Sequence, residues 1–507
     1  MSFRRWGRLA AMVLPTLLCV SCGQVYRPVV IPCAEGGIPG CPPVTPPAPA
    51  NFHAVFGISA NVPGDTGGAL QIDVAGDAII AETPSSDSQF GDNPTHVAIL
   101  PGNSRVYVAS AGSVIPGGVD VVSSFTPAFQ SGSSGGFGPV SAISLPAGSQ
   151  PVFLNTTQSN AMYVANFGTN SVSALSTSSN AVNQTASVGV HPVALAETPN
   201  GLKLYVANQG DNSVSSLNTA ALSSNVVTGF SGMTPVWIVA RGDSQKVYVL
   251  TQGDGQLVTI DTATDTVTSS LPVGAGANFI LYDPHLNRLY VTNPSTNIVY
   301  VFSDTGGAND TPVQLTTIPF NLGSAPCLTG PSNCQPASVT ALPDGSRFYV
   351  ASYQTALSSC PDNLAGSTSC VIPGLSVFDA NSFALRTPTL TLLTYPPFAA
   401  DFTTNQYQYA VPPVTTCIPP AVYTPGATRF RVFTTAAADS SRVYVSMCDA
   451  GAIAVINTTD NNSNNTGGTG IPADTLVCDL PTPFSLGPPQ SNGQPANQSP
   501  IFLLTGQ

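Results

Sequence analysis

Short apolar segments of about five residues recur along most of this chain, separated by polar segments rich in Gly, Asn and Pro. The pattern is clearest in Pro192–Gly232, where four apolar segments follow one another. The strands predicted in this unit are Pro192–Ala196, Lys203–Ala207, Ser213–Leu217 and Asn225–Phe230. Asn200-Gly201 lies between the first two, and this pair favours a tight hairpin because both residues tolerate a positive φ. The unit therefore predicts a four-stranded antiparallel meander.

A Tyr-Val pair marks the second strand of seven such units. The pairs begin at Tyr107, Tyr163, Tyr205, Tyr248, Tyr290, Tyr349 and Tyr444, and they read YVAS, YVAN, YVAN, YVLT, YVTN, YVAS and YVSM. Successive separations of 56, 42, 43, 42, 59 and 95 residues indicate a unit of about 42 with insertions. Such a period is typical of propellers and solenoids, whose units bury their faces only against neighbours. No sustained helical period appears, so we expect little helix.

These copies resemble the YVTN-repeat β-propellers of bacterial and archaeal cell-surface and periplasmic proteins. The resemblance covers most of residues 52–507 and rests on motifs such as Tyr290-Val-Thr-Asn293. It implies an all-β propeller of four-stranded antiparallel blades. It brings no catalytic residues, because the repeated motif is itself structural.

The two ends of the repeat region are predicted to build one blade together. His53–Ile58, Ala69–Val74 and Asp77–Glu82 match the second, third and fourth strands of a unit. Pro500–Leu504 matches a first strand such as Pro151–Leu154. A composite blade would close the ring and remove an exposed sheet edge. The prediction is eight blades, with a seven-bladed ring and loosely attached ends as the alternative.

The first 21 residues have the layout of a secretory signal. Arg4, Arg5 and Arg8 precede an apolar stretch from Leu9 to Val20, and Ser21-Cys22-Gly23 follows. This resembles a bacterial lipoprotein signal, which implies that Cys22 is the acylated first residue. The sequence departs from that pattern at Cys19, where Leu is usual. An ordinary cleaved signal or an uncleaved anchor are the alternatives.

Residues 22–51 are predicted to be a Pro-rich tether between this anchor and the propeller at 52–507. After the signal, no apolar stretch reaches 18 residues, so no other transmembrane helix is expected. We therefore expect an exported, lipid-anchored protein of the cell envelope, facing the periplasm or the cell surface.

The charge balance argues against nucleic acid as a partner. The chain has 14 basic and 26 acidic side chains, and loss of the three signal arginines leaves 11 against 26, a net charge of −15. Nucleic-acid binding needs clustered basic residues. Charged residues make up only 8% of the chain, so its surface is expected to be covered mainly by Ser, Thr, Asn and Gln.

Nine cysteines follow Cys22, and in an exported protein close pairs favour disulfides. They are Cys33, Cys41, Cys327, Cys334, Cys360, Cys370, Cys417, Cys448 and Cys478. The predicted local pairs are Cys33–Cys41, Cys327–Cys334 and Cys360–Cys370, while Cys448 pairs with either Cys417 or Cys478. None of these nine cysteines forms a CxxC with another, so a metal site is the weaker interpretation of these residues.

Several enlarged connections are predicted to gather on one face of the ring. In a four-stranded meander, the turn from the second to the third strand and the connection to the next blade emerge on the same side, here called the loop face. The insertions at 320–336, 354–374 and 396–428 all belong to it. Loops on a rigid scaffold often carry function, so we predict a partner there, although long exported loops also need disulfides simply for stability.

No catalytic, phosphate-binding or haem motif is present, so we expect no cofactor, no metal and no assignable catalytic residue. His96, His191 and Trp237 lie in or near first strands and are the candidates to face a ligand in the central channel, with ordinary structural roles as the alternative. The favoured hypothesis is a binding scaffold for an envelope protein, a glycan or a surface polymer. The alternative is an enzyme resembling propeller lactone hydrolases or quinone-dependent dehydrogenases.

Overall fold

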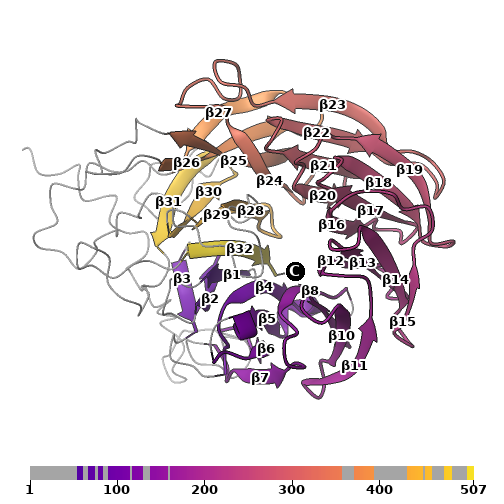
Figure 1. The fold of residues 1–507 in the computed structure, drawn as a ribbon. Helices are drawn as coiled ribbons and strands as arrows, with labels where there is room; N and C mark the ends of the chain where they lie inside the picture. Colours follow the sequence, from indigo (N-terminus) through magenta and orange to yellow (C-terminus); the bar gives the residue numbers. More distant parts are fainter. Residues whose placement is uncertain are drawn as a thin grey trace, which may run out of the picture.

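A computed structural model describes residues 54–60, 67–74, 78–83, 89–114, 117–128, 137–157, 160–356, 370–392, 431–448, 451–459, 473–481 and 499–506. These residues form eight four-stranded antiparallel sheets around one central axis (Figure 1). The same residues include no α-helix, only the short 3-10 helices η2 (Pro101–Asn103) and η3 (Gly112–Val114). Within this part of the chain, no helix has the length and apolar character needed to span a membrane.

Seven blades are consecutive in the chain, and we number them 2 to 8. Blade 2 contains β4 (Pro94–Ile99), β5 (Val106–Ala111), β6 (Asp120–Phe125) and β7 (Ser141–Ser144). Blade 3 contains β8 (Pro151–Asn155), β9 (Ala161–Asn166), β10 (Ser171–Ser176) and β11 (Ala181–Ser187). Blade 4 contains β12 (Pro192–Glu197), β13 (Lys203–Asn208), β14 (Ser213–Asn218) and β15 (Ser223–Val226). Blade 5 contains β16 (Pro235–Ala240), β17 (Lys246–Thr251), β18 (Gln256–Asp261) and β19 (Thr266–Pro272).

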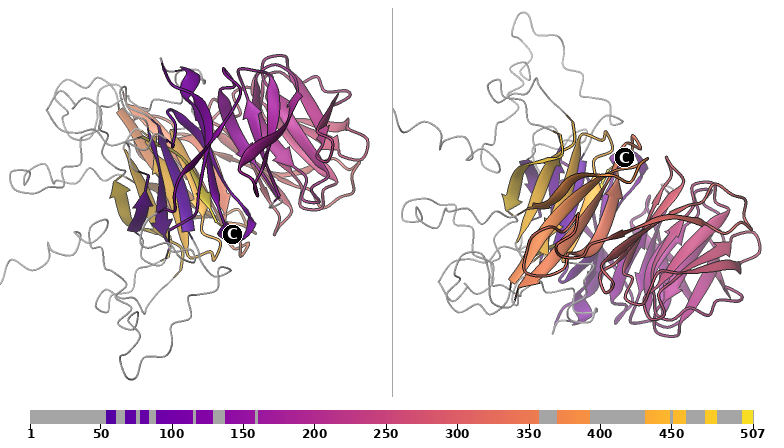
Figure 2. Two further views of the ribbon diagram at one scale, coloured as in Figure 1. Left: turned by 90° about the horizontal axis from the view of Figure 1, so that it is seen from below. Right: turned by 90° about the horizontal axis from the view of Figure 1, so that it is seen from above.

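The next three blades complete the consecutive series. Blade 6 contains β20 (Phe279–Asp283), β21 (Arg288–Asn293), β22 (Ile298–Ser303) and β23 (Val313–Pro319). Blade 7 contains β24 (Gln335–Ala341), β25 (Arg347–Ala356), β26 (Cys370–Asp379) and β27 (Leu385–Thr391). Blade 8 contains β28 (Val432–Ala436), β29 (Arg442–Met447), β30 (Ala452–Asn457) and β31 (Thr475–Pro481). In side view the strands run between the two faces of the ring, so their connections gather on those faces (Figure 2).

Blade 1 joins the two ends of the ring, as the sequence predicts. Its strands are β1 (Ala54–Ala60), β2 (Gly68–Asp73), β3 (Ala78–Glu82) and, innermost, β32 (Ser499–Thr505). β32 pairs antiparallel with β1, which takes the second-strand place (Figure 1). A Cβ added at Gly57 would lie 2.8 Å from Cδ2 of Leu503, so glycine lets the C-terminal strand pack closely. Eight blades with a composite closure are confirmed.

One predicted strand differs from the structure. The fourth strand of blade 4 is β15, which ends at Val226, whereas the sequence pattern places it at Asn225–Phe230. After β15 the chain bonds to the next blade instead: Thr228 N–H donates to Asp265 O, and Val267 N–H donates to Thr228 O. The apolar residues of this segment therefore connect two blades rather than lengthen one.

The Tyr side chains of the repeat lie in the packed interior between blades. All seven are at most 3% exposed, and Phe56 takes the same place in blade 1. Burial raises the pKa of Tyr163 and of Tyr290 to about 12, Glu197 adding to the effect at Tyr163 and Asp283 at Tyr290. Each ring belongs to one of the hydrophobic core clusters, and this packing explains why an aromatic residue recurs at the position.

The Tyr hydroxyl also helps to clasp successive blades. Tyr248 donates to Asp304, which lies in the turn between the third and fourth strands of the next blade. Lys246, two residues before Tyr248, lies 2.8 Å from the same carboxylate, and both side chains are at most 1% exposed. Arg241 adds a third contact to Asp304 at 3.1 Å. Burial and the Asp304 hydrogen bond raise the pKa of Tyr248 strongly, so its hydroxyl stays protonated.

The same clasp recurs in several chemical versions. Tyr205 with Lys203 and Asp265, and Tyr349 with Arg347 and Asp474, repeat the ionic form. Between blades 6 and 7, Arg288 stacks over Phe383 at 5.0 Å instead. Between blades 3 and 4 the corresponding residues are Ala161 and Leu222, and Leu222 belongs to the same hydrophobic cluster as Tyr163. Equivalent interfaces between successive blades are therefore stabilised by ionic, cation–π or apolar side-chain contacts.

Candidate functional site

Each innermost strand places one side chain at the centre of the ring. Strand register defines this position. In each blade, the residue on the innermost strand pairs with the second-strand residue that lies two positions after the repeat Tyr, or two positions after Phe56 in blade 1. The eight residues are His96, Phe153, Ala194, Trp237, Phe279, Ser338, Phe433 and Phe502. Six of them are aromatic or heteroaromatic, and none is more than 9% exposed.

The six rings contact one another in a closed circuit. Their centroid separations are 4.0 Å for His96–Phe153, 5.7 Å for Phe153–Trp237, 5.0 Å for Trp237–Phe279, 5.5 Å for Phe279–Phe433, 4.4 Å for Phe433–Phe502 and 4.4 Å for Phe502–His96. Stacked and edge-to-face pairs at these distances are favourable. Protein side chains therefore fill the axis at this level, where an open propeller would have its channel.

The structure separates the three channel candidates into two groups. His96 and Trp237 both lie in this aromatic circuit, and His96 Nδ1 accepts a hydrogen bond from Leu154 N–H at 3.3 Å. His191 lies apart from them, on the loop face just before β12. It is exposed, has a φ of 52° and stacks on Phe167 with a centroid separation of 4.2 Å. The arrangement of His96 and Trp237 is that of packed interior side chains.

The loop face carries the enlarged connection from β23 to β24, residues 320–334. Cys327 and Cys334 form a disulfide within it, as their spacing predicts. The Ala325–Pro326 peptide bond in this loop is cis. For comparison, only residues 188–191 connect blades 3 and 4. The loop at 320–334 is therefore a large addition to the basic unit that is held in a defined conformation.

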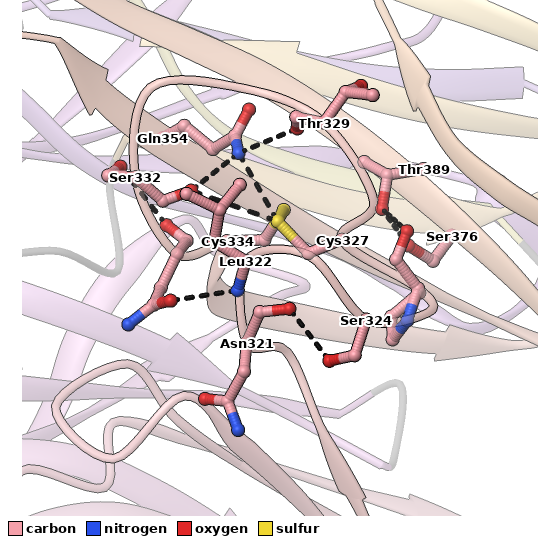
Figure 3. The surroundings of a disulfide bond; sticks show 12 residues. Asn321, Leu322, Ser324, Cys327, Thr329, Ser332, Cys334, Gln354, Ser376 and Thr389 are labelled. Atoms are coloured by element: carbon pink, nitrogen blue, oxygen red, sulfur yellow. Dashed lines mark hydrogen bonds between the residues drawn. A yellow bond between two sulfur atoms is a disulfide. The ribbon is translucent and has the colours of Figure 1, made fainter.

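Gln354 of β25 holds the same loop from the neighbouring blade (Figure 3). Its Nε2 lies 2.7 Å from Ser332 O, 3.1 Å from Thr329 O and 3.2 Å from Cys327 Sγ. Thr355 N–H also donates to Ser332 Oγ at 3.0 Å. Gln354 is 8% exposed. The disulfide closes the loop on itself and Gln354 attaches it to blade 7, a role that the sequence pattern of Gln354 does not reveal.

The second predicted insertion begins as a longer hairpin. β25 and β26 each have ten residues, and they pair from Arg347–Asp379 to Ala356–Cys370. The predicted insertion at 354–374 therefore starts and ends in extended strands, and its centre at 357–369 lies outside the described residues. The insertion at 396–428 lies outside them as well.

The remaining cysteines are only partly described. Cys448 is disulfide-bonded. Cys33, Cys41, Cys360 and Cys417 lie outside the described residues, as do the side chains of Cys370 and Cys478 and the proposed lipidation site at Cys22. The choice between Cys417 and Cys478 as the partner of Cys448 stays open.

A polar hollow of about 350 Å³ opens on the loop face between blades 5, 6 and 7. Blade 5 supplies Gln252, the connection to blade 6 supplies Gly276, and the loop at 320–334 supplies part of the opposite wall. The full lining is Gln252, Gly276, Pro294, Ser295, Asn297, Ser332, Asn333 and Gln335. None of these side chains carries a charge. Groups of three or more His, Cys, Asp or Glu that could hold a metal ion are absent from the described part of the chain.

Asn293, the last residue of a YVTN motif, fixes another wall of the hollow. Its Nδ2 lies 2.9 Å from Val273 O and 2.8 Å from Gly274 O, while its Oδ1 accepts from Ser295 N–H at 2.9 Å. A Cβ added at Gly276 would lie 2.0 Å from Ser295 Oγ, so the two segments touch there without intervening side-chain atoms. The structural motif of the repeat thus also positions residues at the hollow.

Several solved structures are similar to this chain, and at these low identities the likeness concerns the fold alone. They include hydrazine synthase from Kuenenia stuttgartiensis, with 16% identity, a TM-score of 0.45, and coverage of 66% of this chain and 87% of that chain. A putative 6-phosphogluconolactonase from Bacteroides uniformis has 12% identity, a TM-score of 0.45, and coverage of 67% and 97%. The β-propeller domain of Cps50 (Swd1) from Myceliophteria thermophila has 9% identity, a TM-score of 0.47, and coverage of 72% and 96%. No protein-family model matches the chain, and no curated protein matches it.

Proposed function

We propose that this chain is a lipid-anchored cell-envelope protein whose propeller acts as a binding scaffold, with the loop face as its binding surface. The observation that carries the proposal is the loop at 320–334. A 15-residue connection whose interior is fixed by a disulfide and by Gln354 borders a polar hollow. Holding a surface loop in one conformation reduces the entropy lost on binding, and loops on a rigid scaffold commonly carry recognition.

The central axis supports the same choice of surface. The aromatic circuit fills the axis at the level of His96 and Trp237, so a ligand meets the propeller on a face rather than deep in a channel. The binding partner in this proposal is a component of the envelope. The envelope location rests on the sequence alone, on Ser21-Cys22-Gly23 after an apolar stretch and on the Pro-rich segment that follows.

A loop exchange tests the binding surface. We would shorten 320–334 to the length of the 188–191 connection and measure capture of partners from an envelope extract by the full chain. The expected result is loss of the partner by a variant that still unfolds in one cooperative transition, since the eight blades lie outside the shortened loop. The matched control removes residues 462–470 from the connection between β30 and β31 on the opposite face. Retained capture by the loop-face variant, or loss of capture only in the control, would reject the proposal.

A separate substitution tests the anchor. Cys22→Ser removes the thiol that lipidation requires, so the variant should appear in the soluble envelope fraction, while the unchanged chain should need detergent. Detergent-dependent fractionation of the variant would show that another segment anchors the protein. This result would leave the assignment of the binding surface untouched.

A further inference from the structure

Four polar side chains around the hollow have no hydrogen-bond partner in the part of the chain that the structure describes. They are Gln252, Ser295, Asn297 and Gln335. Gln252, Asn297 and Gln335 are half-buried, and Ser295 is exposed. Half-buried amides normally find partners in protein, water or ligand. Amide and hydroxyl groups that the fold leaves unused here converge on one hollow from blades 5, 6 and 7.

The chemistry of this lining selects a class of ligand. Amide groups both donate and accept hydrogen bonds, as sugar hydroxyls do. Phosphate, sulfate or carboxylate groups are typically recognised by Arg or Lys, and the lining has neither. We infer that the hollow binds a neutral saccharide segment of an envelope glycan, an inference that rests on the proposed function of the loop face.

The walls of the hollow are held in place before any ligand arrives. Asn293 holds the turn that carries Ser295 and Asn297, because it bonds backbone groups on both sides of the hollow. Gln354 and the Cys327–Cys334 disulfide hold Ser332 and Asn333, and Asn333 Oδ1 accepts from Leu322 N–H at 2.8 Å. Preorganised groups lose less entropy when they bind a ligand.

The size of the hollow limits what it can hold. Its volume of about 350 Å³ is near the lower end of typical small-molecule sites, which span roughly 300–1,000 Å³. A short segment of a glycan therefore fits, with neighbouring units of the polymer left in solvent. Single-site binding should be weak, and a polymer that presents the same segment repeatedly compensates through avidity.

The test uses the full chain in detergent and immobilised neutral oligosaccharides of glucose, galactose, mannose and N-acetylglucosamine. Sulfated oligosaccharides and an extended neutral peptide serve as comparison ligands. We expect the protein to be retained on at least one neutral sugar. Its affinity should barely change between 50 mM and 500 mM salt, where the Debye length falls from about 14 Å to about 4 Å, because salt does not screen contacts between uncharged groups.

Substitutions then locate the binding site. Gln252→Ala with Gln335→Ala should weaken sugar binding by roughly tenfold or more, since each lost hydrogen bond is worth a factor of about five. The matched control, Gln245→Ala with Asn309→Ala, also removes two side-chain amides, from exposed positions on the opposite face, and should leave binding unchanged. Melting temperatures of both double variants establish that each is folded.

The results distinguish failure of the saccharide inference from failure of the proposed function. Unchanged sugar binding in the Gln252/Gln335 variant, no retention of any neutral sugar, or retention of only the sulfated sugars or the peptide would overturn the inference. The proposed function would still stand if the 320–334 loop remained necessary for partner capture. The proposed function would be rejected if that loop proved unnecessary for partner capture.

Discussion

At the scale of single residues, the repeat Tyr does two things at once. Its ring fills space between blades, and its hydroxyl reaches the next blade where an Asp is available, as Tyr205 does to Asp265 at 2.5 Å. Where the corresponding position is Phe383, Arg288 stacks over that ring instead. The recurrence of Tyr was readable from sequence, but its Asp partner was not, because that residue lies between 56 and 125 positions away in another blade.

The alternative clasps give a direct test of coupling. Lys203→Ala with Asp265→Leu copies the Ala161 and Leu222 arrangement found between blades 3 and 4. Each single change should lower the free energy of unfolding by about 1–3 kcal/mol, because it leaves a charged or hydroxyl partner unpaired. The double change should cost at least ~0.5 kcal/mol less than the sum of the two. Urea unfolding of the four proteins measures this, and strict additivity would show that the residues are not coupled.

Alkaline pH should destabilise the propeller through its buried tyrosines. A pKa raised from 10.0 to about 12 in the folded state, as at Tyr163 and Tyr290, means that the folded chain keeps the proton while the unfolded chain loses it. The stabilisation is complete below pH 10 and is lost progressively between about pH 10 and 12. Unfolding free energy measured across this range should fall. The fall should be smaller in Tyr163→Phe and Tyr290→Phe, and an equal fall in all three proteins would contradict the assignment.

At the scale of elements, the composite blade is the feature that sequence reasoning predicted best. The N-terminal end of the repeat region supplies three strands of a unit, and the C-terminal end supplies the missing first strand. Each strand could be recognised from sequence because the alternation of apolar strands and polar turns is visible within a few neighbouring residues. The loop at 320–334 shows the limit. Its disulfide follows from spacing, whereas Gln354 is a polar residue in an otherwise ordinary strand, and only the packing of blade 7 against the loop gives it a role.

Removal of the closing strand tests this element directly. Deleting Ser499–Gln507 takes away Ile501, Phe502 and Leu503, which are at most 7% exposed, and leaves β1 as an unpaired edge. The melting temperature should fall by about 5 °C or more, since each such side chain contributes a few kcal/mol. Adding a peptide of residues 499–507 should recover part of the loss. An unchanged melt after deletion would mean that the strand does not close the ring.

At the scale of the whole molecule, eight blades form a ring whose axis is filled by aromatic side chains and whose two faces differ. The aromatic circuit had a signal in the sequence, because His96, Phe153 and Trp237 occupy the same place in their units. The hollow had none, since its lining comes from blades 5, 6 and 7 and each residue alone looks like an ordinary turn residue. Periodicity predicts architecture well, while a site formed between units depends on their packing.

Two exposed leucines, one on each face, allow a direct comparison of the loop face with the opposite face as the binding surface. Leu328 lies in the 320–334 loop and is 49% exposed, and Leu202 lies on the opposite face and is 63% exposed. Each would be replaced in turn by a benzophenone amino acid, which captures C–H groups of protein or glycan alike, and irradiated in intact cells. We expect a crosslinked envelope component from position 328 and none from position 202. Crosslinking from position 202 alone would show that the opposite face is the binding surface instead.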